Sequence, residues 1–150
     1  DYEHIWEGKA RTVAEGAIYR HEILDLVASS RIRPVPYDPL LPVHTVWDLG
    51  WNDSMTIGLI QKTHMDVRII GYIEDSHRTL DYYVAELEKL PYRWGVDYIP
   101  HDGRTKNFQT GKSTEELLRA MRRNPTVLSS MSVEEGIKAG IEKFKATQTW

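Results

Sequence analysis

The sequence predicts an α/β domain with a mixed central sheet flanked by helices. Three β-prone apolar runs follow one another across short polar turns, a pattern typical of an antiparallel meander. A segment with one helical apolar stripe comes next and leads to a fourth apolar run. A connection of this length indicates that the fourth strand lies parallel to the first. At 150 residues, the chain is long enough to bury a core of its own.

The composition excludes several classes of protein. Charged residues make up 27% of the chain and no apolar run reaches the length of a transmembrane helix, so we expect a globular domain with no membrane partner. The absence of cysteine excludes disulfides and thiolate metal sites. A net charge of −3 argues against a constitutively bound nucleic-acid protein, but it is compatible with an acidic site that binds divalent cations.

The N-terminal part of the chain is predicted to pack on the remainder. Residues 1–42 hold a helix from about Val13 to Val27 and a connector, Arg31 to Pro42, which four prolines keep extended. Residues 43–150 are expected to form the core. Because the chain begins at Asp1 without a methionine, we interpret it as part of a longer protein.

The first predicted strand ends in an acid and a glycine-containing turn. It runs from Val43 to Trp47 and leads into Asp48, which we expect to be buried within the sheet. A buried carboxylate needs a compensating partner, and a bound cation is the simplest one. Asp53 can fold back across the turn as a second or outer-shell ligand of the same ion. The alternative is that Asp48 only caps the turn by accepting backbone N–H bonds.

The remaining elements follow from hydrophobic periodicity and from start and stop signals. Ser113 or Thr114 is expected to cap one helix, and Ser132 and Glu135 have the spacing of a capping box at the start of another. The predicted strands are Met55 to Gln61, Asp66 to Ile73, Val96 to Pro100 and Thr126 to Leu128, and the predicted helices are Leu80 to Leu90, Glu115 to Arg123 and Val133 to Lys145.

A second acid follows the fourth strand. If the first and fourth strands are parallel neighbours, Asp48 and Asp102 meet at the edge of the sheet where ligands gather, although 54 residues separate them. Paired carboxylates repel each other unless a cation lies between them, and their hard oxygens favour Mg²⁺ or Mn²⁺. Two such ions would activate water and stabilise the leaving oxygen in phosphodiester cleavage. The alternative is that Asp102 caps the loop that follows it.

Other polar residues near these strand ends are candidates for supporting roles. Glu74 and Asp75 follow the third strand and either complete an acidic cluster or belong to the turn before the helix. His101 is a candidate ligand or general base, although an isolated loop histidine is more often solvated.

A basic segment follows Asp102. Arg104, Lys106 and Lys112 are suitably placed to meet phosphates, unless the loop is simply solvated. The Gly-Lys-Ser-Thr run that ends this loop is not a phosphate-binding P-loop, because that motif requires glycine where Lys106 stands.

An ordered series of motifs extends this picture over almost the whole chain. The series is HIWEGK at residues 4–9, GAIY at 16–19, WDLGWNDS at 47–54, IPHDGR at 99–104, TGKS at 110–113 and SVEEGI at 132–137. In this series the sequence resembles the C-terminal nuclease domain of the large terminase subunit of tailed bacteriophages.

The resemblance implies a ribonuclease H-like fold and a DNA endonuclease that cuts concatemeric viral DNA with two Mg²⁺ or Mn²⁺ ions. It assigns the metal-binding acids to Asp48 and Asp102, with Asp53 in support. The implied partners are double-stranded DNA, an ATPase domain in the same full-length chain, the portal protein and the small terminase subunit, in the host bacterial cytoplasm. The family's third acid, from a helix near its C-terminus, is expected beyond Trp150.

Two alternatives share this fold. One is a non-catalytic ribonuclease H-like interaction module between the packaging motor and the portal. The other is a different nuclease of the same fold, such as a Holliday-junction resolvase. An acid pair at Asp48 and Asp102 should bind Mn²⁺ if it is catalytic and need not do so if it is structural.

Overall fold

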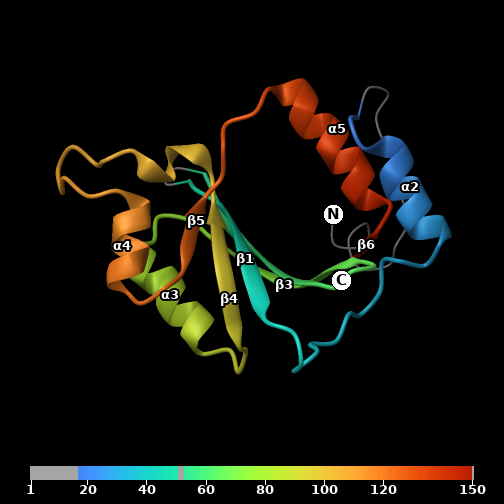
Figure 1. Ribbon diagram of the computed structural model, residues 1–150, viewed down its shortest axis with the longest axis horizontal. Coiled ribbons are helices and arrows are strands. Elements are labelled where there is room, and N and C mark those ends of the chain that lie inside the picture. Colours follow the sequence, from blue (N-terminus) through green and yellow to red (C-terminus); the bar gives the residue numbers. More distant parts are fainter. Residues whose placement is uncertain (1–16, 51–52, 150) are drawn as a thin grey trace.

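The computed structural model describes residues 17–50 and 53–149, which form a six-stranded mixed sheet with helices on either side (Figure 1). The strand order is β5-β4-β1-β2-β3-β6. The strands are β1 (Val43–Asp48), β2 (Met55–Lys62), β3 (Val67–Asp75), β4 (Trp94–Ile99), β5 (Pro125–Val127) and β6 (Thr147–Thr149). The helices are α2 (Arg20–Ala28), α3 (Leu80–Glu88), the 3-10 turn η1 (His101–Arg104), α4 (Thr114–Ala120) and α5 (Val133–Phe144).

The pairing of the strands confirms the predicted α/β fold. β1, β2 and β3 form the antiparallel meander, and β4 lies parallel to β1 after the crossover through α3. β5 continues the parallel part of the sheet beyond β4. The carboxyl ends of β1 and β4 therefore point to the same edge of the sheet, as the sequence predicted.

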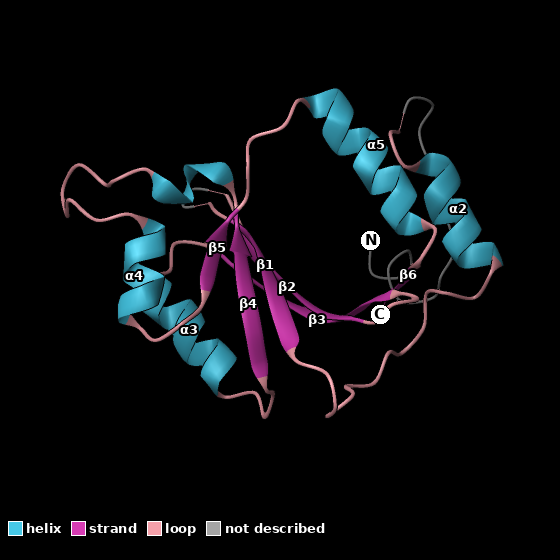
Figure 2. Ribbon diagram, in the orientation of Figure 1, coloured by secondary structure: helices cyan, strands magenta, loops and turns pink. Residues whose placement is uncertain are grey.

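One face of the sheet is covered by α3 and α4 (Figure 2). In β1 the buried residues Val43, Thr45 and Trp47 alternate with residues that are less buried, as expected for a strand with one face on the core. The core joins this face to apolar side chains of the two helices: Ile57, Leu59 and Ile99 from the sheet, and Tyr83, Val84, Leu87 and Leu118 from the helices. Their burial stabilises the meander and the crossover as one unit.

A buried ion pair also belongs to this layer. Asp97 in β4 is 1% exposed, and its carboxylate binds the Arg123 guanidinium at 2.5 and 3.0 Å. It also accepts hydrogen bonds from the Thr45 hydroxyl and the Asn124 backbone N–H. The Arg123 guanidinium stacks over the Trp94 ring at 4.8 Å. These contacts join β4 to β1 and to the chain that enters β5, so Asp97 is a structural acid.

Helices α2 and α5 pack against each other over the opposite end of the sheet (Figure 2). The rings of Tyr19 and Phe144 lie 5.1 Å apart. Gly140 allows the close approach of the Tyr19 ring, because a Cβ there would lie 2.5 Å from the Tyr19 hydroxyl oxygen. The helix predicted from Val13 begins at Arg20 within the described residues, and positions 13–16 lie outside them.

The edge strand β6 was not predicted. It pairs with β3, and Ile32 in the connector forms a parallel bridge with Thr149. The Arg33 N–H donates to the Thr149 carbonyl at 2.9 Å, and the Thr149 N–H donates to the Arg31 carbonyl at 3.1 Å. The connector therefore extends the sheet as well as spanning the distance to β1.

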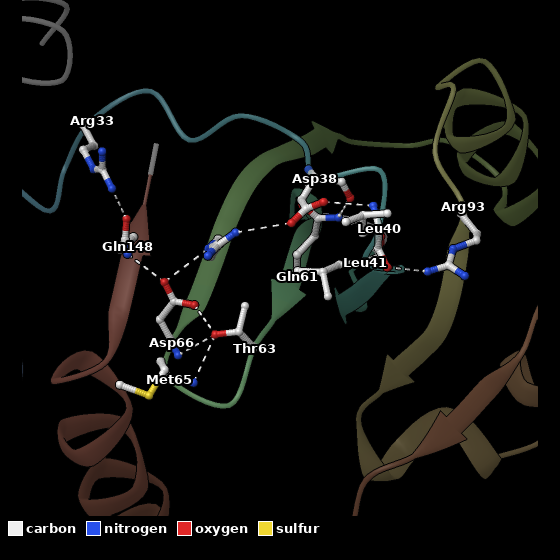
Figure 3. Close-up of polar contacts among 11 residues, drawn as sticks. Arg33, Asp38, Leu40, Leu41, Gln61, Thr63, Met65, Asp66, Arg93 and Gln148 are labelled. Carbon is white, nitrogen blue, oxygen red and sulfur yellow. Dashed lines mark hydrogen bonds and ion pairs between the residues drawn. The ribbon is translucent and has the colours of Figure 1, made fainter.

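A polar network fixes the connector against the far end of the sheet (Figure 3). The Gln61 side chain is fully buried, accepts from the Asp38 N–H and donates to the carbonyls of Asp38 and Leu41. Asp66 accepts from Gln148 of β6 at 2.7 Å and from Arg68 at 3.2 Å. Since each of these polar groups finds a partner, the connector has one defined path along the sheet.

No helix within the two described ranges combines the length and the apolar character needed to cross a bilayer.

Candidate functional site

Asp48 is the last residue of β1, and it is exposed. The prediction that it is buried was wrong, because the alternation along β1 places it on the face away from Trp47 and the core. Its carboxylate makes no side-chain hydrogen bond or ion pair with another described residue. The turn residues Trp51 and Asn52, to which Asp48 could act as a cap, lie outside the described residues.

Asp102 lies in η1, the short helical turn that follows β4. The sequence predicted a loop here. The turn begins after Pro100, and the Gly103 N–H donates to the Pro100 carbonyl at 2.9 Å. Gly103 is buried against Ile99, where a Cβ would lie 2.7 Å from the Ile99 Cδ1, so glycine allows the turn to pack on the strand. This packing leaves the Asp102 side chain exposed at the edge of the sheet.

Asp48 and Asp102 lie at the same end of two neighbouring strands. In the parallel register Val46 pairs with Tyr98, so Asp48 is two residues past this pair on β1, and Asp102 is four residues past it along the chain, in η1. A cavity of about 710 Å³ opens at this edge and is lined by Asp102 and by Leu49 and Gly50, which directly follow Asp48. The two strand ends that carry the predicted acids therefore lie at one end of the sheet, although Asp48 itself does not line this cavity.

The strand register separates the two acids at the end of β3. Glu74 is exposed and pairs with Thr56, which pairs with Asp48, so the three residues form one row on the same face of the sheet. Asp75 lies on the other face and accepts from the Ser76 N–H and the Tyr82 hydroxyl. The Ser76 N–H and then the Tyr82 hydroxyl hold the pKa of Asp75 below its ordinary value. Asp75 therefore anchors the turn before α3, whereas Glu74 shares the face of the sheet on which Asp48 lies.

The two other candidates near the acids are exposed. The backbone of Asp53 lies close to Gly50, since a Cβ at Gly50 would approach the Asp53 carbonyl oxygen to 3.3 Å. The Asp53 and His101 side chains make no hydrogen bond or ion pair with another described residue. The turn residues Trp51 and Asn52 lie outside the described residues.

The basic residues after Asp102 are in different environments. Arg104 forms an ion pair with Glu115 at 3.6 Å, which offsets part of its charge. Lys106 and Lys112 are exposed and line a hollow of about 370 Å³ together with Asn107 and Thr110. Within the described part of the chain neither lysine has an ion-pair partner, so both remain available to an anion.

Arg78 and Asn107 also line the cavity next to Asp102, and the sequence had not pointed to either. Arg78 lies just before α3, where it pairs with Asp75 and stacks over the Tyr82 ring at 4.8 Å. The crossover through α3 brings it to this edge, and no sequence spacing signals such a long-range placement.

The donor set fits a hard divalent cation only in part. Carboxylate oxygens such as those of Asp48 and Asp102 are the ligands that Mg²⁺ and Mn²⁺ prefer. Across residues 17–50 and 53–149, however, no three acidic or histidine side chains are gathered closely enough to hold a metal. The described site therefore has the chemistry for an ion and lacks a third ligand among its gathered side chains.

Comparison with known proteins identifies the fold. No family model and no curated protein matches the chain. Among solved structures, the P22 large terminase nuclease domain aligns with a TM-score of 0.62 and 15% identity, over 92% of this chain and 74% of that one. The large terminase nuclease of thermophilic phage G20c with bound magnesium aligns with a TM-score of 0.60 and 18% identity, over 91% of this chain and 75% of that one.

Longer proteins share the same fold over part of their length. The large terminase of another thermophilic bacteriophage aligns with a TM-score of 0.61 and 12% identity, over 79% of this chain. The alignment spans 31% of that longer terminase. The chain therefore has the ribonuclease H-like fold of the large terminase nuclease domains.

Proposed function

We propose that this chain is the nuclease domain of a phage DNA-packaging terminase and hydrolyses phosphodiester bonds of double-stranded DNA with divalent metal ions. The observation that carries the proposal is the placement of Asp48 and Asp102, two exposed carboxylates at the carboxyl ends of adjacent parallel strands. The magnesium bound to the G20c nuclease, which has the same fold, supports the choice of metal.

In this mechanism Asp48 and Asp102 would hold the metal, with Asp53 and Glu74 as supporting acids. Two ions, Mg²⁺ or Mn²⁺, when bound would supply an activated water and stabilise the leaving oxygen. The parallel strands set the spacing of the two carboxylates. The hydrogen-bonded main chain of β1 and the packing of η1 on Ile99 fix the backbone positions from which the two side chains extend.

Lys106 and Lys112 supply positive charge on the approach to Asp102. We assign them to the phosphates on either side of the cut, and Arg104 to a weaker contact because it is shared with Glu115. In a chain with a net charge of −3, a few such contacts give weak and salt-sensitive DNA binding. Such binding suits a nuclease that receives its DNA from a motor.

The wider context follows from the same proposal. The domain would act beside an ATPase domain in one full-length chain, with the portal protein and the small terminase subunit as partners, in the host bacterial cytoplasm. The longer thermophilic-phage terminase, which contains this fold in about a third of its chain, supports the arrangement.

The test is a calorimetric titration of the chain with Mn²⁺, combined with cleavage of supercoiled plasmid in Mn²⁺ and in EDTA. We expect weak binding of about one ion, since a second ion needs further carboxylates, and slow cleavage that EDTA abolishes. Two tight sites would show that Glu74 or another acid in this chain completes the centre.

The second candidate is a non-catalytic interaction module. It is favoured by the lack of three gathered ligands among the described residues. Absence of both Mn²⁺ binding and cleavage would select it over the nuclease.

A further inference from the structure

The segment between η1 and α4 forms a small hairpin that closes on itself. Lys106 and Ser113 form an antiparallel bridge, and the Asn107 N–H donates to the Lys112 carbonyl at 2.9 Å. Gly111 has a φ of 68°, a left-handed conformation suited to glycine, and its N–H donates to the Asn107 carbonyl at 2.8 Å. Figure 1 shows this segment projecting from the body of the molecule at the left of the view.

The tip of the hairpin has its own internal support. The Asn107 side-chain oxygen accepts from the backbone N–H groups of Gln109 and Thr110, at 2.8 and 3.2 Å. This is an Asx-type turn, which fixes the backbone without help from the rest of the protein. The turn residue Phe108 can therefore be presented to solvent in a defined position.

Phe108 is fully exposed, at 103%. Single exposed apolar residues are common on proteins, so exposure alone has no functional meaning. Phe108 is distinguished by its surroundings, because it lies on a hydrogen-bonded tip between Lys106 and Lys112. By contrast, Met65 is 86% exposed in the turn between β2 and β3, which lies at the other end of the strands from Asp102.

The hairpin concentrates positive charge in an acidic chain. Residues 103–114 contain Arg104, Lys106 and Lys112 and no acid, whereas the whole chain has a net charge of −3. An aromatic side chain between cations is the combination that binds nucleic acids, because the cations contact phosphates and the ring stacks on or wedges between bases.

The hairpin is also joined to the candidate site. Asn107 lines both the hollow that contains Lys106 and Lys112 and the cavity that contains Asp102. DNA bound along the hairpin would therefore pass next to the acid that follows β4.

We propose that the hairpin of residues 106–113 engages duplex DNA by inserting the Phe108 ring between neighbouring base pairs, while Lys106 and Lys112 bind the flanking phosphates. This inference rests on the proposed DNA substrate. The inserted ring partly unstacks one base step and kinks the duplex there. The hairpin thereby sets which phosphodiester lies at Asp102, and it favours steps that are easily unstacked.

The experiment measures DNA binding in EDTA, where cleavage does not occur, with duplexes that carry 2-aminopurine, whose emission rises when the base is unstacked. We expect the unsubstituted chain to raise the emission on binding. Phe108→Ala should lower the affinity roughly tenfold, as for loss of one stacked base, and remove the rise in emission. Phe108→Trp should retain both. Lys106→Ala should weaken binding and reduce its salt dependence while the emission per bound complex still rises.

Met65→Ala is the matched control for loss of an exposed apolar side chain, and it should change neither affinity nor emission. If Phe108→Ala binds DNA with the parent affinity and the same emission, the inference is overturned. The tip of the hairpin would then either contact a protein or have no binding role. Failure of the unsubstituted chain to bind duplex DNA also overturns it. Mn²⁺ binding and cleavage are scored separately: emission that depends on Phe108, with neither Mn²⁺ binding nor cleavage, would support the hairpin's role and reject the nuclease.

Discussion

Asp97 and Asp48 lie on adjacent strands of one sheet, but their carboxylates are in opposite environments. Asp97 is buried on the core face, where its carboxylate is bound by Arg123, Thr45 and the Asn124 N–H. Asp48 is exposed on the other face and has no side-chain partner among the described residues. A strand acid can therefore be stabilised by its own protein, or it can be left open to bind something else.

The difference shows how to separate a structural acid from a functional one. A buried carboxylate needs several donors in place before folding is favourable, and those donors occupy its oxygens. Asp97 is in this state and has no capacity for a ligand. Asp48 and Asp102 are exposed and are the proposed metal ligands, so substitutions there should reduce activity and spare stability, whereas disruption of the Asp97 pair should reduce stability.

The largest expected effect is on cleavage. Asp48→Asn should abolish plasmid cleavage in Mn²⁺, because it removes a charge from the proposed ion site with almost no change in volume. Its thermal midpoint should stay close to that of the parent, since the side chain is exposed. Parallel cleavage and melting assays check both parts.

Asp102→Asn should lose activity to the same extent, and the double variant should lose little more, because residues that act as a unit are not additive. Additive partial losses in the double variant would instead assign separate roles to the two acids.

The next effect is on stability. Arg123→Ala leaves the Asp97 carboxylate buried without its main partner and should destabilise the fold by about 3–5 kcal/mol, measured by urea unfolding. Arg119→Ala is the control, because its pair with Glu115 is on the surface and should contribute only about 0–1 kcal/mol. Equal losses in the two variants would contradict the structural role assigned to Asp97.

A smaller effect is expected at the cap of α4. Ser113 accepts from the Glu116 N–H in a capping box and is 3% exposed, so Ser113→Ala should destabilise the protein by roughly 1 kcal/mol. Ser132 forms the same box at the start of α5 and is exposed. Ser132→Ala should lower the free energy of unfolding less than Ser113→Ala does, since water can replace the hydroxyl at the exposed position 132. Urea unfolding of the two variants side by side decides between them.

The smallest effect concerns pH. The pKa of Asp75 is lowered first by the Ser76 N–H and then by the Tyr82 hydroxyl, so its ionised form stabilises the native state. That stability is fully present above the ordinary pKa of 3.8 and is lost as the pH falls through the lower folded-state value. In Asp75→Asn, the free energy of unfolding should fall less steeply as the pH is lowered through the acid range. Glu88→Gln, which removes an exposed carboxylate of α3, should leave that pH dependence unchanged.

Local patterns were sufficient to predict most of the sheet. The apolar runs predicted β1, β2 and β3. The apolar stripe of α3 predicted a helical crossover, and therefore a β4 that lies parallel to β1. The capping box of Ser132 and Glu135 was predicted from their spacing, and of the two cap candidates for α4 the structure selects Ser113, which forms a box with Glu116. These features depend on residues close together in the chain, so a single sequence contains them.

Features that depend on distant partners were not predicted. β6 has the sequence Thr-Gln-Thr, too short and polar to show a pattern, and it forms because β3 and the connector offer it an edge. Asp97 is stabilised by Arg123, 26 residues further along. The orientation of Asp48 could have been read from the sequence, because strict alternation from Val43 and Trp47 places it on the face away from the core.

The pairing of Ile32 with Thr149 has a mechanical consequence. Because these segments are parallel, tension applied along the polypeptide pulls the connector towards its start and β6 towards its end, in opposite directions along one axis. The two hydrogen bonds between Thr149 and the backbone of Arg31 and Arg33 are then loaded together in shear. Bonds loaded together in shear would resist such a pull better than those of an antiparallel edge, which would open one at a time.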